Sequence, residues 1–156
     1  MLARDIMTGK VVCARPTDSL FDAAERMLGA DVGALLVVNE AGEILGIISE
    51  ADLVRRAEID AAPGKSWLQC LLRSDAATGR ESMSGRGLRV GDIMTGEVVT
   101  ASEDTPLEGL VERLRRYKVK RIPIVRDGIP VGIVSRADLM RAVLSSETAA
   151  GRRPQA

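Results

Sequence analysis

The stretch GIISEADL, from Gly46 to Leu53, decides how this sequence is interpreted, because it occurs twice. It returns as GIVSRADL from Gly132 to Leu139, and the earlier stretch DIMTG at Asp5–Gly9 returns at Asp92–Gly96. The two copies are offset by 87 residues, and the offset falls to 86 after a one-residue deletion in copy two. Chance does not produce two long blocks that match in register, so the chain contains an internal duplication.

Each copy is predicted to fold in the order β-α-β-β-α. Apolar residues recur at helical spacing in the second segment of each copy. In the Thr105-Pro106-Leu107-Glu108 sequence we expect Thr105 to cap a helix and Pro106 to occupy its first position. An Asp127-Gly128 pair between two apolar runs predicts a tight hairpin turn. In copy one the predicted segments are strand 11–14, a helix over Leu20–Leu28, strands 34–38 and 44–48, and a helix from Ser49 to about Ala57. In copy two they are strand 98–101, a helix from Thr105, strands 121–125 and 131–134, and a helix from Ser135 to about Leu144.

The predicted fold class is α/β, of the α+β kind, with two tandem β-α-β-β-α motifs. About 50 residues bury too little apolar surface to fold well alone, so we expect the motifs to pack together with pseudo-twofold symmetry. The predicted divisions are motif one at 1–58, a linker with a short helix at 59–91, motif two at 92–146 and a disordered tail at 147–156.

The composition excludes several classes of function. The 156 residues include no His, so neither a Ser-His-Asp arrangement nor a His-ligated metal is possible, and no metal site is expected. Aromatic residues make up 2% of the chain, too few for a base-stacking platform. Lys plus Arg and Asp plus Glu both number 22, which argues against general binding to a phosphate backbone, so nucleic acid is not expected as a partner.

The expected setting is the cytoplasm. Cys13 and Cys70 lack CxxC spacing and are expected to be reduced structural thiols rather than a disulfide. The first residues carry charges and no apolar stretch follows them, so no signal peptide is expected. No apolar run approaches the roughly 20 residues that span a bilayer, so no membrane contact is expected.

The repeated residues resemble the CBS motif, and two copies resemble a CBS-domain pair, or Bateman module, of the bacterial stand-alone type. The resemblance rests on DIMT followed by VV, a helix, an apolar strand and G-[IV]-[IV]-S-x-A-D-L, and it covers about 5–56 and 92–143. It implies a regulatory module that binds AMP, ADP, ATP or S-adenosylmethionine in the cleft between the two motifs.

Carried over residue by residue, the resemblance assigns Asp52 and Asp138 to the ribose hydroxyls, and Ser49 and Ser135 to the phosphate. The chemistry agrees, because one carboxylate can accept two hydroxyl donors and a helix start offers free N–H groups to an anion. The alternative is structural: Ser and Asp at this spacing also form a helix capping box, and the two roles can coexist.

The resemblance places adenine against backbone groups of the first extended segment and of the entry to the middle strand. The alternative is that most of these side chains belong to the core. The residues assigned to this pocket are Thr8, Val11, Gly33, Ala34, Thr95, Val98, Ile122 and Pro123.

Copy two is far more basic than copy one at the entry to its middle strand. The stretch Arg113–Arg126 holds seven Lys or Arg and no acidic residue. A solvated helix face explains the first of these cations, but Lys120 and Arg121 fall beside the predicted cleft, where they could neutralise phosphate. We therefore predict two unequal sites, of which one prefers the phosphorylated ligand.

The favoured function is non-catalytic ligand sensing, with a protein target acting in trans and a homodimer formed through the helices, as the resemblance implies. An enzyme would have to use Asp52, Asp138, Cys13 or the two serines without a His base, so the sequence gives little support for catalysis. The other alternative is a protein or nucleic-acid interaction scaffold that uses the basic helix of copy two.

Overall fold

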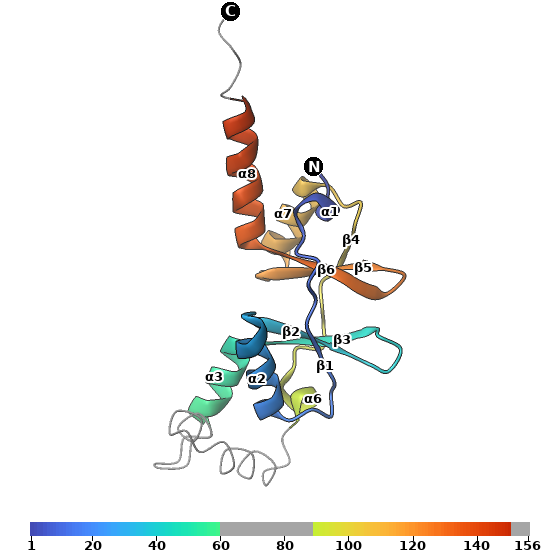
Figure 1. The fold of residues 1–156 in the computed structure, drawn as a ribbon, viewed down its shortest axis with the longest axis vertical. Coiled ribbons are helices and arrows are strands. Elements are labelled where there is room, and N and C mark those ends of the chain that lie inside the picture. Colours follow the sequence, from blue (N-terminus) through green and yellow to red (C-terminus); the bar gives the residue numbers. More distant parts are fainter. Residues whose placement is uncertain (60–88, 151–156) are drawn as a thin grey trace, which may run out of the picture. The chain divides into compact units, whose positions relative to one another are not determined.

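The computed structural model describes residues 1–59 and 89–150. The described chain forms two compact units (Figure 1). The β1–β3 unit contains residues 12–59 and 89–97, and the β4–β6 unit contains residues 1–11 and 98–150. The predicted helix at 66–72 and most of the predicted linker lie outside the described residues.

The β1–β3 unit is a three-stranded sheet in the order β1-β2-β3, with α2 and α3 together on one side of it (Figure 1). β1 runs parallel to β2, and β3 is antiparallel to β2. The elements are β1 Cys13–Ala14, α2 Leu20–Ala30, β2 Ala34–Val38, β3 Ile44–Ser49, α3 Glu50–Ile59 and α6 Val90–Ile93.

The β4–β6 unit repeats this topology, with sheet order β4-β5-β6 and the same parallel and antiparallel pairings. The two three-stranded sheets with their helices confirm the predicted mixed class and the predicted element order. The elements are α1 Ala3–Ile6, β4 Ala101–Ser102, α7 Leu107–Arg116, β5 Arg121–Arg126, β6 Ile129–Ser135 and α8 Arg136–Ala150.

Each repeat contributes its first segment to the unit built by the other repeat. Thr8 exchanges backbone hydrogen bonds of 2.9 and 3.0 Å with Ile133. Thr95 exchanges bonds of 2.9 and 3.0 Å with Ile47. The spatial units therefore differ from the sequence repeats, because residues 1–11 belong with 98–150.

The exchange explains which residue types occur in the two DIMT segments, Asp5–Thr8 and Asp92–Thr95. The carboxylates of Asp5 and Asp92 each accept a backbone N–H, from Leu2 and Arg89 respectively, at 2.7 Å, and so cap the short helices α1 and α6. The apolar residues that follow pack on the core of the receiving unit, and the threonines pair with its third strand. Neither short helix is predicted from the sequence, because four residues carry no periodic signal.

Aliphatic side chains build both cores. The β1–β3 unit buries Leu35 and Ile48 fully, together with Val90 from α6. The β4–β6 unit buries Leu110, Ile122 and other aliphatic side chains, together with Ala3 from α1. Fully burying a side chain such as that of Val90 stabilises a fold by about 1.5–3 kcal/mol, so the exchanged segment of α6 contributes to stability directly. The smaller side chain of Ala3 contributes less.

Two helix ends differ from the sequence-based expectation. Thr105 does not cap α7; its hydroxyl accepts the backbone N–H of Ser102 at 3.1 Å, and Pro106 occupies the N-cap position. α8 continues through Ala150, beyond the end expected near Leu144 and into the predicted tail. Hydroxyls of Ser145, Ser146 and Thr148 bond to carbonyls one turn back, so these polar residues remain compatible with a helix.

The exchanged segments approach the third strand of each sheet at a glycine. A Cβ built on Gly46 would lie 2.7 Å from both the Met94 sulfur and the Thr95 carbonyl oxygen. A Cβ on Gly132 would lie 2.5 Å from the Met7 sulfur and 3.1 Å from the Thr8 carbonyl oxygen. At Gly46 only glycine allows so close an approach of two backbones, whereas at Gly132 the closest contacts are with the flexible Met7 side chain and the backbone oxygen of Thr8 would have to shift slightly.

We predict that Gly46→Ala and Gly132→Ala each destabilise the protein by about 1–3 kcal/mol, because the methyl group forces the exchanged segment away from the strand. Chemical denaturation monitored by circular dichroism measures this loss. Gly96→Ala is the matched control, since nothing lies within 4 Å of its built Cβ. Equal stability of the control and the two variants would contradict the close packing of these segments.

Candidate functional site

The strand-to-helix junction of each unit carries the repeated Ser and Asp. In the β1–β3 unit, the Asp52 Oδ2 accepts the backbone N–H of Ser49 at 2.8 Å and the Ser49 hydroxyl at 3.0 Å. The Ser49 Oγ accepts the backbone N–H of Asp52 at 3.3 Å. These reciprocal bonds form the capping box that the sequence analysis gives as the structural alternative.

The β4–β6 unit has the same junction with one addition. Asp138 Oδ2 accepts the Ser135 backbone N–H at 2.7 Å and its hydroxyl at 2.8 Å. The second oxygen, Oδ1, lies 3.3 Å from a guanidinium nitrogen of Arg141, whose side chain is 70% exposed. The i,i+3 spacing could have indicated this pair, but sequence reasoning missed it.

The second carboxylate oxygen is not used by the capping bonds at either junction, and among the described residues only at Asp138 does it have a partner, the exposed Arg141. Both capping bonds use Oδ2, so in the described part of the chain Asp52 Oδ1 accepts no hydrogen bond. At Asp138 the exposed Arg141 can swing away from Oδ1 at little cost, because a surface ion pair contributes about 0–1 kcal/mol. The capping role therefore leaves room for a second role in binding.

In the β1–β3 unit, the fold brings five of the predicted site residues to this junction. Ala34 is the register partner of Ser49 across the β2–β3 pair, and the Gly33 carbonyl accepts the backbone N–H of Glu50 at 3.0 Å. The exposed Thr95 pairs with Ile47, two residues before Ser49. The assembled residues are Gly33, Ala34, Ser49, Asp52 and Thr95.

The β4–β6 unit assembles the corresponding set. Arg121 is the register partner of Ser135, and the Lys120 carbonyl accepts the backbone N–H of Arg136 at 3.3 Å. The exposed Thr8 pairs with Ile133, two residues before Ser135. Each site thus takes its Thr from one repeat and its Ser and Asp from the other. The sequence of the repeats does not reveal this combination.

The remaining predicted pocket residues are placed differently. Ile122 is fully buried in the core of the β4–β6 unit, so its side chain is a core side chain and only its backbone is available to a ligand. Pro123 and Ala34 are also buried. Val11 and Val98 are half-buried, and no described contact ties either of them to the Ser-Asp junction.

The two junctions differ in charge. The β4–β6 junction carries Lys120, which is exposed, and Arg121, which is half-buried. The equivalent positions in the β1–β3 unit are Gly33 and Ala34. In residues 1–59 and 89–150 neither cation takes part in an ion pair, so their charge is uncompensated.

Cys13, one of the candidate nucleophiles, is free and half-buried on β1. Burial raises the pKa of its thiol, and the nearby Arg15 opposes that shift to a smaller extent. A raised pKa keeps the thiol protonated near neutral pH and lowers its reactivity. The environment of Cys13 is that of a structural cysteine.

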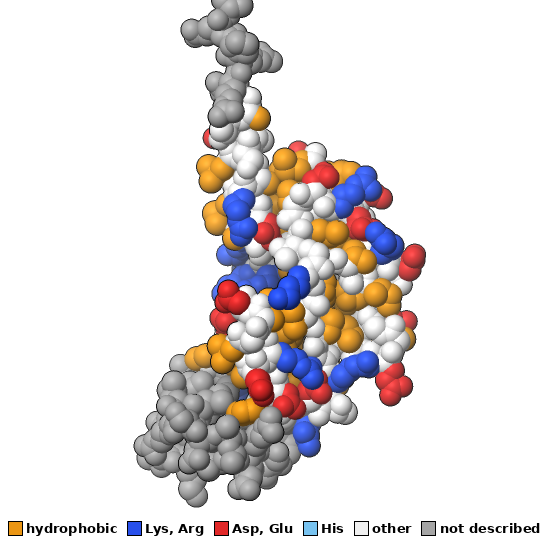
Figure 2. Space-filling model, viewed as in Figure 1, with side chains coloured by type: hydrophobic (Ala, Val, Ile, Leu, Met, Phe, Trp, Pro, Cys, Tyr) orange, Lys and Arg blue, Asp and Glu red, His pale blue; other side chains and the backbone are white. Residues whose placement is uncertain are grey.

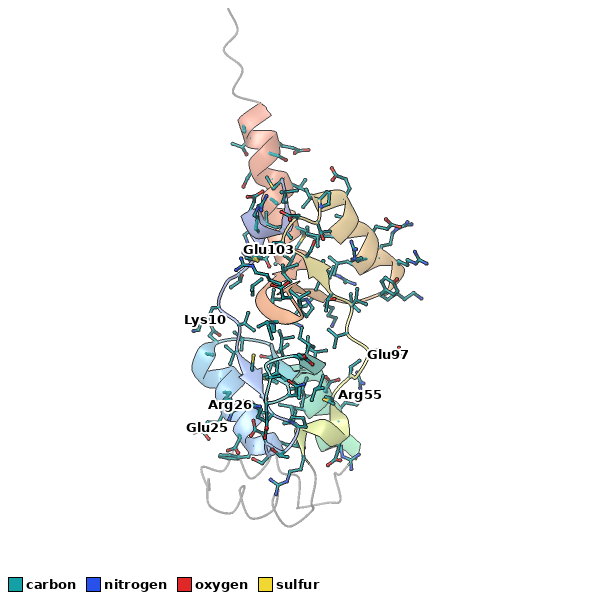
Figure 3. All side chains as sticks on the ribbon, turned by 90° about the vertical axis from the view of Figure 1, so that its right-hand side faces the viewer. Lys10, Glu25, Arg26, Arg55, Glu97 and Glu103 are labelled. Carbon is teal, nitrogen blue, oxygen red and sulfur yellow. The ribbon has the colours of Figure 1, made fainter. Side chains whose placement is uncertain are left out.

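The pKa shifts elsewhere belong to a surface clamp outside the junctions. Arg126 donates two hydrogen bonds of 2.7 Å to the carboxylate of Glu103, which lies beside β4 (Figure 3). These bonds, followed by the Coulombic attraction of Arg126, lower the pKa of Glu103.

Across the described residues, no group of three or more His, Cys, Asp or Glu is placed to hold a metal ion. No described helix has the length and apolar content needed to cross a membrane.

Comparison with known proteins finds one family. The family model described as CBS domain matches twice, at residues 3–58 and 90–145. The chain is 27% identical over 147 residues to the uncharacterized protein YlbB of Bacillus subtilis, covering 94% of this chain and 84% of YlbB. It is 30% identical over 139 residues to the uncharacterized protein MK0525 of Methanopyrus kandleri, and it spans 58% of that longer protein.

Solved structures share this fold. The CBS domain of a CBS-domain-containing membrane protein from Sphaerobacter thermophilus is 33% identical, with a TM-score of 0.71 over 90% of this chain and 86% of that one. The structure of CBSX2 in complex with AMP is 27% identical, with a TM-score of 0.70 over 94% of this chain and 98% of that one.

We predict that Asp138→Ala lowers the free energy of unfolding by about 1 kcal/mol, because the backbone N–H of Ser135 loses its capping acceptor. Asp138→Asn should cost less, since its amide oxygen can still accept that N–H. Urea denaturation of the two variants measures the difference. Equal losses for Ala and Asn would contradict the capping role.

Proposed function

Because the chain belongs to the CBS-domain family, we propose that it is a non-catalytic regulatory module that binds an adenosine-containing ligand and signals to a protein partner in trans. The observation that carries the proposal is the duplicated Ser-Asp junction, in which a carboxylate stands at a helix start with an oxygen still available. The AMP complex of CBSX2, which shares this fold at 27% identity, supports the ligand class.

The junction chemistry suits a ribose next to a phosphate. The two hydroxyls of a ribose are donors, and the available Oδ1 of Asp52 or Asp138 accepts them through charge-assisted bonds. The Ser49 and Ser135 hydroxyls lie at the same helix starts, where the positive end of the helix dipole favours an anion. The exposed Thr8 and Thr95 add a hydroxyl from the exchanged segment.

Adenine recognition is assigned to backbone groups in this proposal. The Gly33–Ala34 and Ile122–Pro123 segments enter the middle strands beside the junctions. Val11 and Val98 each lie three residues after the threonine of an exchanged segment, Thr8 and Thr95 respectively. Backbone N–H and C=O groups can read the edge of the base without an aromatic partner. Burial of the Ile122 side chain favours this backbone route.

The charge difference between the junctions supports unequal sites. Lys120 and Arg121 place two cations at the β4–β6 junction, whereas Gly33 and Ala34 place none at the other. A phosphorylated ligand such as AMP, ADP or ATP would bind better at the junction with Lys120 and Arg121. A ligand without phosphate, such as S-adenosylmethionine, gains nothing from these cations and would depend less on which junction it occupies.

We also propose that the module is a homodimer. α8 leaves several large apolar side chains exposed, including Met140 at 62% and Leu144 at 64%. Exposed apolar side chains at neighbouring positions of one helix favour association with a partner surface. A dimer gives ligand binding a quaternary arrangement to shift, which a target protein can read.

We expect at least one of AMP, ADP, ATP, S-adenosylmethionine and NADH to raise the melting temperature. Ligand at 100 times its Kd stabilises the folded state by about 2.7 kcal/mol. The double variant Asp52→Asn with Asp138→Asn should abolish the shift while leaving the capping bonds largely in place. Asp127→Asn, at an exposed turn, is the control for the loss of a carboxylate away from the junctions. A thermal-shift panel with no responding compound would remove the nucleotide proposal.

We expect Arg121→Ala to weaken ATP binding about tenfold at one of two sites, while adenosine binding changes little, because the lost interaction is with phosphate. Isothermal titration calorimetry of the wild type should resolve two unequal sites. Arg115→Ala, an exposed cation on α7, is the matched control. Two identical sites, or ATP affinity unchanged in Arg121→Ala, would disprove the inequality.

A further inference from the structure

The end of the β1–β3 sheet that lies opposite the Ser-Asp junction borders a cavity of about 600 Å³. At the junction Ala34 pairs with Ser49, whereas the cavity adjoins the other end of the same strand pair, where Val38 pairs with Ile44. The two pairs are separated along β2 by about 13 Å, and the β2–β3 turn extends away from α3 (Figure 1). Small-molecule sites measure roughly 300–1,000 Å³. The cavity is lined by the β1–α2 turn at 15–17, by the end of β2 at 38–40, and by Leu45 of β3.

Two hydrogen-bonded turns form the walls of this cavity. In the turn between β1 and α2, the Asp18 Oδ2 accepts the backbone N–H of Arg15 at 2.8 Å and the Arg26 guanidinium at 2.6 Å. In the turn between β2 and β3, the Asn39 Oδ1 accepts the backbone N–H of Glu43 at 3.0 Å, and the Asn39 N–H donates to the Glu43 carbonyl at 3.0 Å. Both walls are thus ordered without a ligand, which lowers the entropic cost of binding one.

The floor of the cavity is apolar. Val38 is 7% exposed, and Leu45 is 37% exposed. The strand register passes over Leu45, because Val37 pairs with Gly46 and Val38 pairs with Ile44, so Leu45 occupies a β-bulge. A bulge turns a side chain out of the regular alternation of a strand and is common beside functional sites. Together with the proline of the first turn, these side chains offer a ligand an apolar surface.

The described rim of the cavity carries a cation on one turn and an anion on the other. Arg15 lies on the β1–α2 turn and Glu40 on the β2–β3 turn, and both are exposed. Among residues 1–59 and 89–150, neither takes part in an ion pair, and the Thr17 hydroxyl makes no hydrogen bond. Acidic, basic and apolar side chains are all visible around the β2–β3 turn (Figure 2). A ligand can therefore meet both charges above the apolar floor.

The β4–β6 unit closes the equivalent place with an ion pair of its own. The 87-residue offset aligns Pro16 with Glu103 and Asn39 with Arg126. In the β4–β6 unit, Arg126 donates two hydrogen bonds of 2.7 Å to the Glu103 carboxylate, which joins the two turns. The β1–β3 unit has proline and asparagine at these positions, but it has the guanidinium of Arg15 on the first turn. A carboxylate supplied by a ligand would provide the partner that the β4–β6 unit provides from its own chain.

We propose that this cavity binds a free amino acid with an apolar side chain. The Arg15 guanidinium binds the carboxylate of the ligand, which it can hold through two parallel hydrogen bonds. The Glu40 carboxylate accepts the ammonium group, and the side chain of the ligand lies on Leu45 and Val38. Glu40 would repel a simple carboxylic acid and Arg15 would repel a simple amine, so the two charges together favour a zwitterion. The site is independent of adenosine binding, because its lining residues are not those of the Ser-Asp junction.

An NMR titration of the isotope-labelled protein tests the location of the site, with L-leucine and L-methionine as probes. We expect the backbone amide signals of Thr17, Glu40 and Leu45 to shift as either amino acid is added, because these residues line the cavity. The signals of Ser49 and Asp52, at the other end of the strand pair, should stay in place. If the three cavity signals move with neither probe, the proposal is overturned.

Three analogues of L-leucine each lack one group that the proposed binding mode uses. Isocaproic acid lacks the ammonium group, isoamylamine lacks the carboxylate, and free glycine lacks the apolar side chain. Each should bind at least about tenfold more weakly than L-leucine, because a charge-assisted hydrogen bond or an apolar contact is lost. An analogue that binds as tightly as L-leucine would overturn the assignment of an apolar amino acid as the ligand.

Arg15→Gln and Glu40→Gln should each weaken L-leucine binding at least about tenfold, because each removes one charged partner of the ligand. Both side chains are exposed and have no ion pair among the described residues, so the melting temperature should stay at the wild-type value. The matched controls are Arg55→Gln on α3 and Asp127→Asn, at the position equivalent to Glu40 in the β4–β6 unit, and both should keep the wild-type affinity. Unchanged affinity in either Arg15→Gln or Glu40→Gln would overturn the binding mode, while the thermal shift caused by an adenosine ligand reports separately on the junctions.

Discussion

The exchange of the two DIMT segments is the constraint on which the rest of the structure depends. Backbone hydrogen bonds join Thr8 to Ile133 and Thr95 to Ile47, and glycines at 132 and 46 allow that approach. The same segments bring Ala3 and Val90 into the cores of the units that receive them. Because each unit needs a segment from the other repeat, the duplicated halves are not independent folding units, although each carries a full sequence motif.

The exchange also assembles the candidate sites. A Thr from one repeat reaches the third strand of the other, two residues before the Ser that begins the capping box. The Asp of that box supports the helix through Oδ2, which leaves Oδ1 as the group available to a ligand. Stability and binding can therefore share one carboxylate, since a carboxylate has more acceptor positions than the cap requires.

Sequence reasoning predicted the second and third strands of each copy and the long helices, because duplication gave two views of one pattern. The first strands are shifted and shorter than the predicted 11–14 and 98–101, since they are Cys13–Ala14 and Ala101–Ser102. The strands at 34–38 and 44–49 differ from their expected bounds by at most one residue. It failed where local signals were short or ambiguous: the four-residue helices α1 and α6 carry no period, and Thr105 bonds to Ser102 rather than capping α7. The capping alternative for Ser49 and Asp52 could be written from spacing, but spacing does not say which carboxylate oxygen stays available.

The sequence by itself determined the duplication, the element order of each copy, the family and the concentration of cations in copy two, because all four are patterns along the chain. Only the tertiary structure decided which Thr joins which Ser and Asp, since strand pairing across about 125 residues in one case and about 48 in the other leaves no local mark. The alignment of the two copies already pairs Asp31 with Lys118 and Glu50 with Arg136; the structure adds that the first pair shares a left-handed backbone and the second pair shares a hydrogen bond to the segment entering the middle strand. The sign of each charged side chain is known from the sequence, but whether that side chain faces solvent without an ion-pair partner is decided only when the chain folds.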